Sequence, residues 1–355
     1  MGVCDEWRMS PPFLMDLHSD LGCWGGMARM CTRVLYTGKG GRVLTGRTMD
    51  WKVDLPTNLW VFPRGVSRNG GAGDRSYSWV SKYGSIVASG YDVSTTDGLN
   101  EAGLSANLLW LVESEYPPLD GDRPIISIAL WAQYVLDNFA TVAEAVEELA
   151  KEEFIVATST VPGETRLATM HLSISDATGD SAIFEYIDGE LVINHSPEYK
   201  VMTNSPTFTE QRAIASYWED IGGTIMLPGT NRAADRFVRA KFYVNAVPQV
   251  EERRIALAAI SSVIRNVSVP YGITTPGEPN ISSTRWRTVA DHKDLRYYFE
   301  TTLMPGAFWA KLGNFNLDEG APALRLDVRA QQEAGRSGEA SAEFKEAEPF
   351  KFEGV

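Results

Sequence analysis

The stretch CTRVLYTGKGGRVLTGRTMDW, from Cys31 to Trp51, consists of two short apolar runs joined by a glycine-rich turn. The runs are Cys31–Thr37 and Arg42–Thr48, and the turn between them is Gly38–Gly41. Glycine supplies the positive φ that a tight strand reversal needs, so this pattern predicts a β-hairpin with a cysteine at its head.

Cys31 is predicted to be a nucleophile that carries its own base. As the first residue of the working protein, it would attack with its thiol while its α-amine, with an ordinary pKa of about 7.7–8.0, moves the proton. Arg47 would favour the thiolate and position polar groups of the substrate. Asp50 would hold the amine by a charge-assisted hydrogen bond.

The spacing of Arg47 and Asp50 complicates this hypothesis. The two residues are an odd number of positions apart, so strict alternation along a strand sends their side chains to opposite faces. Both are expected to serve one site only if the strand ends or bulges near Thr48-Met49. The alternative is that both are solvated charges at a strand end.

Composition restricts the partners. The chain has 355 residues, of which 44% are hydrophobic and 22% charged, which is typical of a soluble globular protein with a large core. A net charge of −13 argues against nucleic acid and against an anionic membrane surface. No run of 18 apolar residues predicts a membrane span, and Cys4, Cys23 and Cys31 leave no disulfide framework for the main body.

Residues 1–30 differ from the rest of the chain and lack the basic start and apolar core of a signal peptide. We expect a propeptide, a disordered leader, or a start codon assigned too early, since Met30 directly precedes Cys31. A start at Met30 would favour the cytoplasm, with the periplasm as the alternative. Residues 31–355 are expected to form a single domain, with a polar tail excursion near 329–347. Pro349–Phe352 is apolar enough that we expect it to dock on the domain again.

Strands are predicted before the helices and again after them, which indicates layered antiparallel sheets instead of an alternating βαβ repeat. The predicted strands are Asn58–Val66, Tyr77–Lys82, Ser85–Ser89, Leu104–Val112, Leu167–Ser175, Ser181–Ile187, Glu190–His195, Lys200–Asn204, Trp286–Asp291, Leu295–Thr302 and Ala307–Leu312. The predicted helices are Ile125–Asn138, Val142–Lys151, Thr209–Tyr217, Ala233–Asn245 and Val250–Asn266. Thr141 is the predicted N-cap of the second helix, with Glu144 at capping-box spacing. Tyr77–Lys82 and Ser85–Ser89 are predicted to pair with each other around Tyr83-Gly84, and the segment 97–103 is predicted as a turn.

The block CTRVLY…GRTMDW resembles the start of the choloylglycine hydrolase family of linear amide hydrolases. This family of N-terminal-nucleophile enzymes includes conjugated bile salt hydrolases and penicillin V acylases. Further matching blocks are DGLNEAGLSANLLWL at 97–111, VMTNSPTF at 201–208, DRFVRAKF at 235–242, STRWRTVADHKDLRYYFETT at 283–302 and PFKF at 349–352. The resemblance implies an α+β fold: a four-layer αββα sandwich of two antiparallel sheets between helical layers.

The resemblance also implies that Cys31 attacks an amide carbonyl to form a thioester, which water then hydrolyses. Asn204 matches an asparagine that donates to the oxyanion, and Arg236 matches a second active-site arginine. The alternatives are a strand-end turn residue for Asn204 and a helix surface charge for Arg236. No cofactor or metal is implied; the partner is a small-molecule N-acyl amide, and the expected assembly is a homotetramer.

Trp110 and Trp51 bear on the substrate. Bile salt hydrolases tend to have asparagine at position 110 and many Gram-positive penicillin V acylases tyrosine, so tryptophan at both positions is similar to the Gram-negative branch. That branch favours penicillin V and long-chain N-acyl homoserine lactones. The two indoles predict a flat apolar wall for an aryl or acyl chain, with Met49 as a further substrate contact. The alternative is that both tryptophans are core residues.

Three other functions compete with this hypothesis. The first is a conjugated bile salt hydrolase. The second is an unprocessed, non-catalytic protein that binds acyl ligands on the same scaffold. The third, a Ser–His hydrolase, is disfavoured because no motif joins a serine to His171, His195 or His292, which also lack the helical pairing typical of a metal site.

Overall fold

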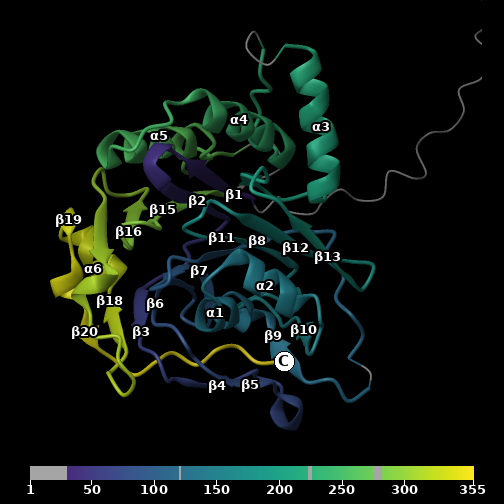
Figure 1. Ribbon diagram of the computed structural model, residues 1–355, viewed down its shortest axis with the longest axis vertical. Coiled ribbons are helices and arrows are strands. Elements are labelled where there is room, and N and C mark those ends of the chain that lie inside the picture. The colour runs from purple at the N-terminus through teal and green to yellow at the C-terminus, as the bar shows by residue number, and fades with distance from the viewer. Residues whose placement is uncertain (1–29, 120, 223–225, 275–281) are drawn as a thin grey trace, which may run out of the picture.

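The computed structural model describes residues 30–119, 121–222, 226–274 and 282–355. Two large sheets face each other, and helices cover the outer face of each (Figure 1). This arrangement confirms the predicted αββα sandwich. The predicted leader lies outside the described residues except for Met30, which begins the first strand.

The first sheet has the strand order β14-β1-β2-β15-β16-β17-β19, and its neighbours are antiparallel except for the pair β17 and β19. Its strands are β1 (Met30–Thr37), β2 (Val43–Trp51), β14 (Val201–Met202), β15 (Ser283–Asp291), β16 (Arg296–Thr301), β17 (Phe308–Lys311) and β19 (Gly338–Glu339). The hairpin β1–β2 therefore lies near the centre of this sheet.

The second sheet is antiparallel, with the order β13-β12-β11-β8-β7-β6-β3-β18-β20. Its strands are β3 (Leu59–Phe62), β6 (Ser85–Gly90), β7 (Ser94–Asn100), β8 (Ser105–Trp110), β11 (Met170–Ser175), β12 (Ser181–Ile187), β13 (Glu190–His195), β18 (Leu324–Leu326) and β20 (Lys345–Glu346). Two small pairs accompany it: β4 (Ser67–Asn69) with β5 (Ser78–Val80), and β9 (Ile125–Ser127) with β10 (Ile155–Ala157).

Helices α1 and α2 cover the second sheet, and α3, α4 and α5 lie on the side of the first sheet (Figure 1). Their bounds are α1 (Ile128–Asn138), α2 (Val142–Leu149), α3 (Phe208–Asp220), α4 (Ala233–Ala246), α5 (Arg253–Asn266) and, near the C-terminus, α6 (Val328–Glu333). The predicted capping box of α2 is confirmed, because Thr141 and Glu144 exchange hydrogen bonds. None of these helices is long and apolar enough to cross a membrane, within the residues described.

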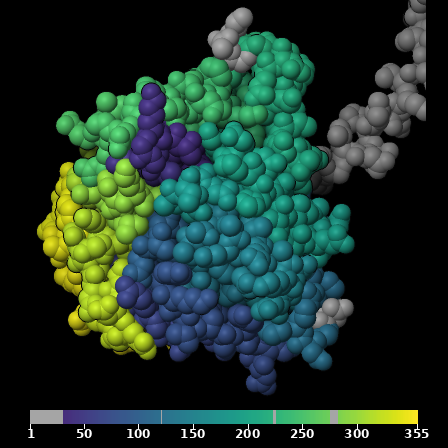
Figure 2. Space-filling model, in the orientation of Figure 1, coloured from purple at the N-terminus to yellow at the C-terminus, as the bar shows by residue number. Residues whose placement is uncertain are grey.

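The β1–β2 hairpin is confirmed, and two glycines close its turn. Gly40 and Gly41 adopt φ values of 62° and 70°, which a residue with a Cβ rarely takes. Further along β2, a Cβ on Gly46 would lie 2.7 Å from Cγ1 of Ile264 in α5, so the glycine lets this helix approach the strand. In Figure 2 only the exposed turn of the hairpin reaches far out of the surface, while its strands are enclosed.

Part of the strand assignment was wrong around residues 77–103. The segment predicted as a turn contains the end of strand β7, and Asn100 there is buried and donates to the carbonyl oxygens of Leu136 and Phe139. Strand β5 pairs with β4 and not with β6. Long-range packing, invisible in local turn chemistry, decides both cases.

The tail also differs from the predicted excursion. Between residues 328 and 346 it forms α6 and two short strands that pair with β17 and β18. The buried side chains of Val328 and Phe344 anchor this segment, and the Phe344 ring packs against Phe315 at 4.9 Å. The expected docking of the last apolar residues is confirmed, since the ring centres of Phe350 and Trp60 are 5.4 Å apart.

Candidate active site

Cys31 lies at the N-terminal end of β1 with its side chain buried between the two sheets. Its Sγ atom is 4.0 Å from Nη2 of Arg47 and 4.0 Å from Sδ of Met49. Arg47 reaches across to the second sheet, where Nη2 donates to the carbonyl oxygen of Leu108 at 3.0 Å. The thiol therefore faces the space between the sheets with a guanidinium beside it.

Burial raises the pKa of the Cys31 thiol above its usual 9.0, and the charge of Arg47 opposes this shift. With residue 30 attached, the thiol is thus protonated at neutral pH. Activation of this sulfur requires a base in addition to Arg47.

The backbone of Cys31 is held by a separate polar cluster. Its N–H donates to Oδ1 of Asn204 at 2.5 Å, and Nη2 of Arg236 donates to the same oxygen at 2.9 Å. Two donors at one atom identify it as the amide oxygen, so Nδ2 is the atom that donates to the Trp110 carbonyl at 2.6 Å. The amide of Asn204 keeps one further N–H, for which the described residues supply no partner.

Arg236 and Asp50 complete this cluster. Nη1 of Arg236 donates to the Cys31 carbonyl at 2.6 Å and lies 3.8 Å from Oδ2 of Asp50. The Asp50 carboxylate also accepts from Thr284 at 2.6 Å and from Thr48 at 3.2 Å. Burial raises the pKa of Asp50 to about 6, although Arg236 and both hydroxyls favour the charged form.

Arg47 and Asp50 occupy opposite faces of β2, as alternation requires, yet both lie near Cys31. The bulge expected near Thr48-Met49 is absent from the unbroken β1–β2 pairing; the register shift falls instead on β15, between Thr284 and Trp286. No bulge is needed because the thiol lies on one face of the sheet and the cluster around the Cys31 backbone on the other. The alternative of solvated charges is also wrong, since Arg47 is 1% exposed and Asp50 0%.

A pocket of about 720 Å³, including its open mouth, leads to the thiol. Cys31, Arg47, Met49, Trp51 and Trp110 all line it. The indoles of Trp51 and Trp110 lie 6.2 Å apart with an interplanar angle of 64°, so they form a corner and not the predicted flat wall. The remaining lining is mostly apolar, which suits an aryl or acyl group.

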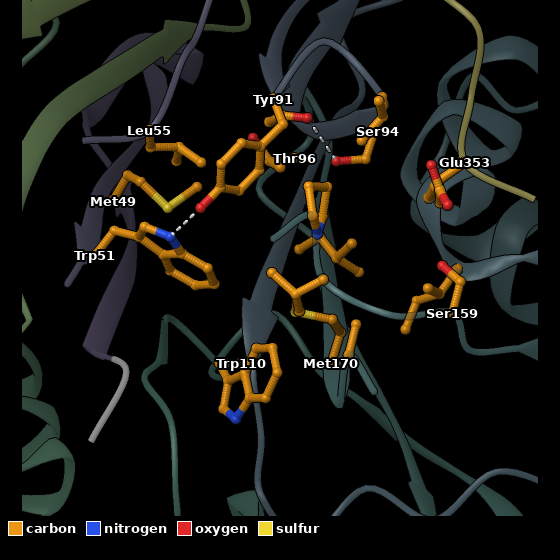
Figure 3. Close-up of a pocket in the computed structure, with 18 of the residues that line it drawn as sticks. Met49, Trp51, Leu55, Tyr91, Ser94, Thr96, Trp110, Ser159, Met170 and Glu353 are labelled. Carbon is orange, nitrogen blue, oxygen red and sulfur yellow. Dashed lines mark hydrogen bonds between the residues drawn. The ribbon is translucent and has the colours of Figure 1, made fainter. Parts of the chain in front are cut away.

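Several lining residues were not identified from the sequence. Tyr91 accepts a hydrogen bond from Nε1 of Trp51 at 2.8 Å and has a φ of 55° (Figure 3). Leu55, Met170 and Glu353 also line the pocket. They come from loops and strands far apart in the chain, and no local pattern marks them.

Asp97 is a further missed residue. It lies on β7, with Oδ2 3.9 Å from Nη1 of Arg47, and accepts from Nδ2 of Asn107 at 2.6 Å and from the Tyr297 hydroxyl. The Arg47 guanidinium also lies 4.7 Å from the centre of the Trp286 ring. Asp97 therefore supports Arg47 from the second sheet.

Comparison with known proteins agrees with this geometry. Residues 31–324 match the linear amide C–N hydrolases of the choloylglycine hydrolase family. The chain belongs to this family. A penicillin V acylase from Pectobacterium atrosepticum is 53% identical over 347 residues, covering 92% of each chain. A conjugated bile acid hydrolase from Lactobacillus gasseri is 27% identical, covering 68% of this chain and 83% of the relative.

Solved structures show the same fold. The penicillin V acylase of Agrobacterium tumefaciens is 60% identical, with a TM-score of 0.85, and the match covers 92% of this chain and 100% of that one. A conjugated bile acid hydrolase from Clostridium perfringens is 22% identical, with a TM-score of 0.71 over 82% of this chain and 95% of that chain. The chain is thus a hydrolase of linear amide C–N bonds on an N-terminal-nucleophile fold, as the sequence predicts.

Proposed function

We propose that Cys31, freed by removal of residues 1–30, cleaves N-acyl amides with an apolar acyl group, of which penicillin V and N-acyl homoserine lactones are the leading examples. The penicillin V acylases at 53% and 60% identity support this substrate class. The family match also starts at residue 31, which supports Cys31 as the mature start.

The observation that carries the proposal is the division of Cys31 between two environments. Its thiol opens on the acyl pocket, while its nitrogen lies 2.5 Å from Oδ1 of Asn204 in the cluster that contains Asp50. Loss of Met30 converts this nitrogen into an α-amine whose ordinary pKa is near 8. Asn204 and Asp50 then orient the amine so that it can exchange a proton with the thiol.

The reaction follows from these positions. The free amine takes the thiol proton, and the thiolate attacks the amide carbonyl. The remaining N–H of Asn204 donates to the oxygen that becomes negative, an interaction worth about 3–4 kcal/mol of barrier in comparable sites. The tetrahedral intermediate expels the amine product, which receives the proton. Water, deprotonated by the same α-amine, then hydrolyses the thioester.

Intact mass spectrometry of purified, active protein tests the processing step. We expect a mass that corresponds to a chain beginning at Cys31, and no hydrolysis by the Cys31→Ala variant. Ser341→Ala, which alters another buried small polar residue outside the pocket lining, serves as the matched control. Full activity in protein that retains residues 1–30 would overturn the proposal.

A substrate panel separates the candidate functions. Penicillin V, a long-chain N-acyl homoserine lactone and a glycine-conjugated bile salt should be hydrolysed at different rates, with the first two preferred. Preference for the bile salt would favour the activity of the 27% identical relative. Binding without turnover, together with slow labelling of Cys31 by iodoacetamide, would favour the non-catalytic alternative. The homotetramer remains part of the proposal, and analytical ultracentrifugation tests it.

A further inference from the structure

Glu353, in the C-terminal segment 349–355, lines the acyl pocket. Figure 3 shows Glu353 across the pocket from Met49, whose Sδ lies 4.0 Å from the Cys31 sulfur. The family match ends at residue 324, and Glu353 directly follows the PFKF block at 349–352, which resembles the family.

The backbone of Glu353 is fixed on both sides. Its N–H donates to the Val93 carbonyl at 2.9 Å, and its carbonyl accepts from Oγ of Ser127 at 2.6 Å. Two residues later, the N–H of Val355 donates to the Gly71 carbonyl at 2.9 Å. Ser127 is also the N-cap of α1, so the segment is attached to a rigid element and Glu353 has a defined position.

Glu353 and Arg47 are the two charged residues among those that line the pocket in the described part of the chain. Arg47 lies beside the thiol, and Glu353 lies on the opposite side. The Glu353 side chain is half-buried, and its carboxylate has no hydrogen bond or ion pair among the described residues. Ser94 and Ser159 line the same pocket, and Figure 3 shows both on the side of the view where Glu353 is drawn.

We propose that Glu353 is a specificity-determining residue that interacts with the far end of the acyl group. It favours acyl groups that end in a hydroxyl or a protonated amine, and it excludes those that end in a carboxylate. A donor at that end gives the unpartnered carboxylate a hydrogen bond, whereas a second anion beside it is repelled. The inference rests on the proposed function, because it requires the acyl group to occupy this pocket.

Three series of N-acyl homoserine lactones test this inference on the full-length protein. Their acyl chains end in a methyl, an amino or a carboxyl group and increase in length from six to twelve carbons in steps of two. Glu353→Gln keeps the shape of the side chain and removes its charge. We expect kcat/KM to rise about tenfold for the carboxyl series, fall about tenfold for the amino series and stay unchanged for the methyl series.

The change should be largest at the chain length that brings the terminal group to residue 353. Glu348→Gln, an exposed residue of the same C-terminal region, should leave all three series unchanged. Equal changes in all three series on Glu353→Gln, or no change in any, would overturn the inference. Failure of the proposed function is a distinct outcome, because the wild-type protein would then hydrolyse none of the methyl-ended substrates.

Discussion

Arg47 and Asp50 lie on opposite faces of strand β2, and Cys31 lies between the two groups that they form. Arg47 borders the thiol at 4.0 Å on the side of the pocket. Asp50 belongs to the cluster in which Asn204 and Arg236 hold the backbone of Cys31. The strand thereby separates an apolar site for the acyl group from a polar site for the backbone nitrogen of Cys31. Cys31 reaches both sites, the first with its thiol and the second with its nitrogen.

Asp50→Asn should lower kcat about a hundredfold, because a neutral amide loses a charge-assisted hydrogen bond worth roughly 3 kcal/mol with the α-ammonium group. Steady-state kinetics on penicillin V measures the effect, and intact mass shows whether processing still occurs. Asp54→Asn, an exposed aspartate four positions away, is the control and should behave like wild type. Unchanged kcat in processed Asp50→Asn protein would contradict the role given to this carboxylate.

Arg47→Met should shift the alkylation of Cys31 to higher pH. Burial raises the pKa of the thiol and the charge of Arg47 is the largest influence that opposes this shift, so its removal should raise the thiol pKa further. The rate of iodoacetamide labelling between pH 6 and 10 measures this shift by comparing Arg47→Met with wild type. The same comparison is repeated with Asp50→Asn present in both proteins. A labelling profile that does not move would contradict the electrostatic role of Arg47.

The same variant should lose stability, because Asp97 is left as a buried carboxylate without its ion pair, at a cost of about 3 kcal/mol. The double variant Arg47→Met/Asp97→Asn should recover most of this loss in urea unfolding without restoring thiol reactivity. That combination separates structural support from activation of the sulfur.

The sequence was sufficient to predict the parts of the site that lie within one element. The glycines of the hairpin, the capping box of α2 and the alternation of Arg47 and Asp50 depend on near neighbours, and each is confirmed. The resemblance placed Asn204 and Arg236 beside Cys31, and the distances agree. Their roles in the reaction remain predictions.

The rest could not be predicted because it depends on contacts between distant segments. Asp97 looks like a turn residue locally, yet strand β7 carries it to Arg47. Glu353 follows a short aromatic run that gives no sign of the pocket wall it forms. Tyr91 reaches Trp51 from a left-handed backbone conformation, which a tyrosine does not signal in a sequence.

Trp110→Asn should change the preference between substrates more than the overall activity. The variant removes the indole whose ring centre lies 6.2 Å from that of Trp51, and this enlarges the pocket at that corner. Because apolar contact with the acyl group is lost, we expect kcat/KM for penicillin V to fall about tenfold. Activity toward a glycine-conjugated bile salt should fall less or rise. Trp309→Phe, on strand β17 and outside the pocket lining, is the control. Equal losses on both substrates would assign Trp110 to the core alone.

His292 should make the protein less stable as the pH falls from about 6.5 to 4. Its ring is buried, with Nδ1 donating to the Gly103 carbonyl at 2.7 Å and Nε2 accepting from Thr45 at 2.8 Å, and burial lowers its pKa from 6.5 to about 4. Below pH 6.5 the unfolded chain binds a proton that the folded protein does not, so the free energy of unfolding falls until the folded form also titrates near pH 4.

The expected loss from His292 is about 3 kcal/mol across this window. His292→Asn keeps the donor to Gly103 and removes the titration, so its free energy of unfolding should depend less on pH. Asp50, whose raised pKa acts in the opposite sense between pH 6 and 3.8, contributes equally to both proteins and cancels in the difference. Urea unfolding at half-unit steps from pH 4 to 7 measures the difference in the free energy of unfolding between wild type and His292→Asn. Parallel pH profiles for these two proteins would contradict the prediction.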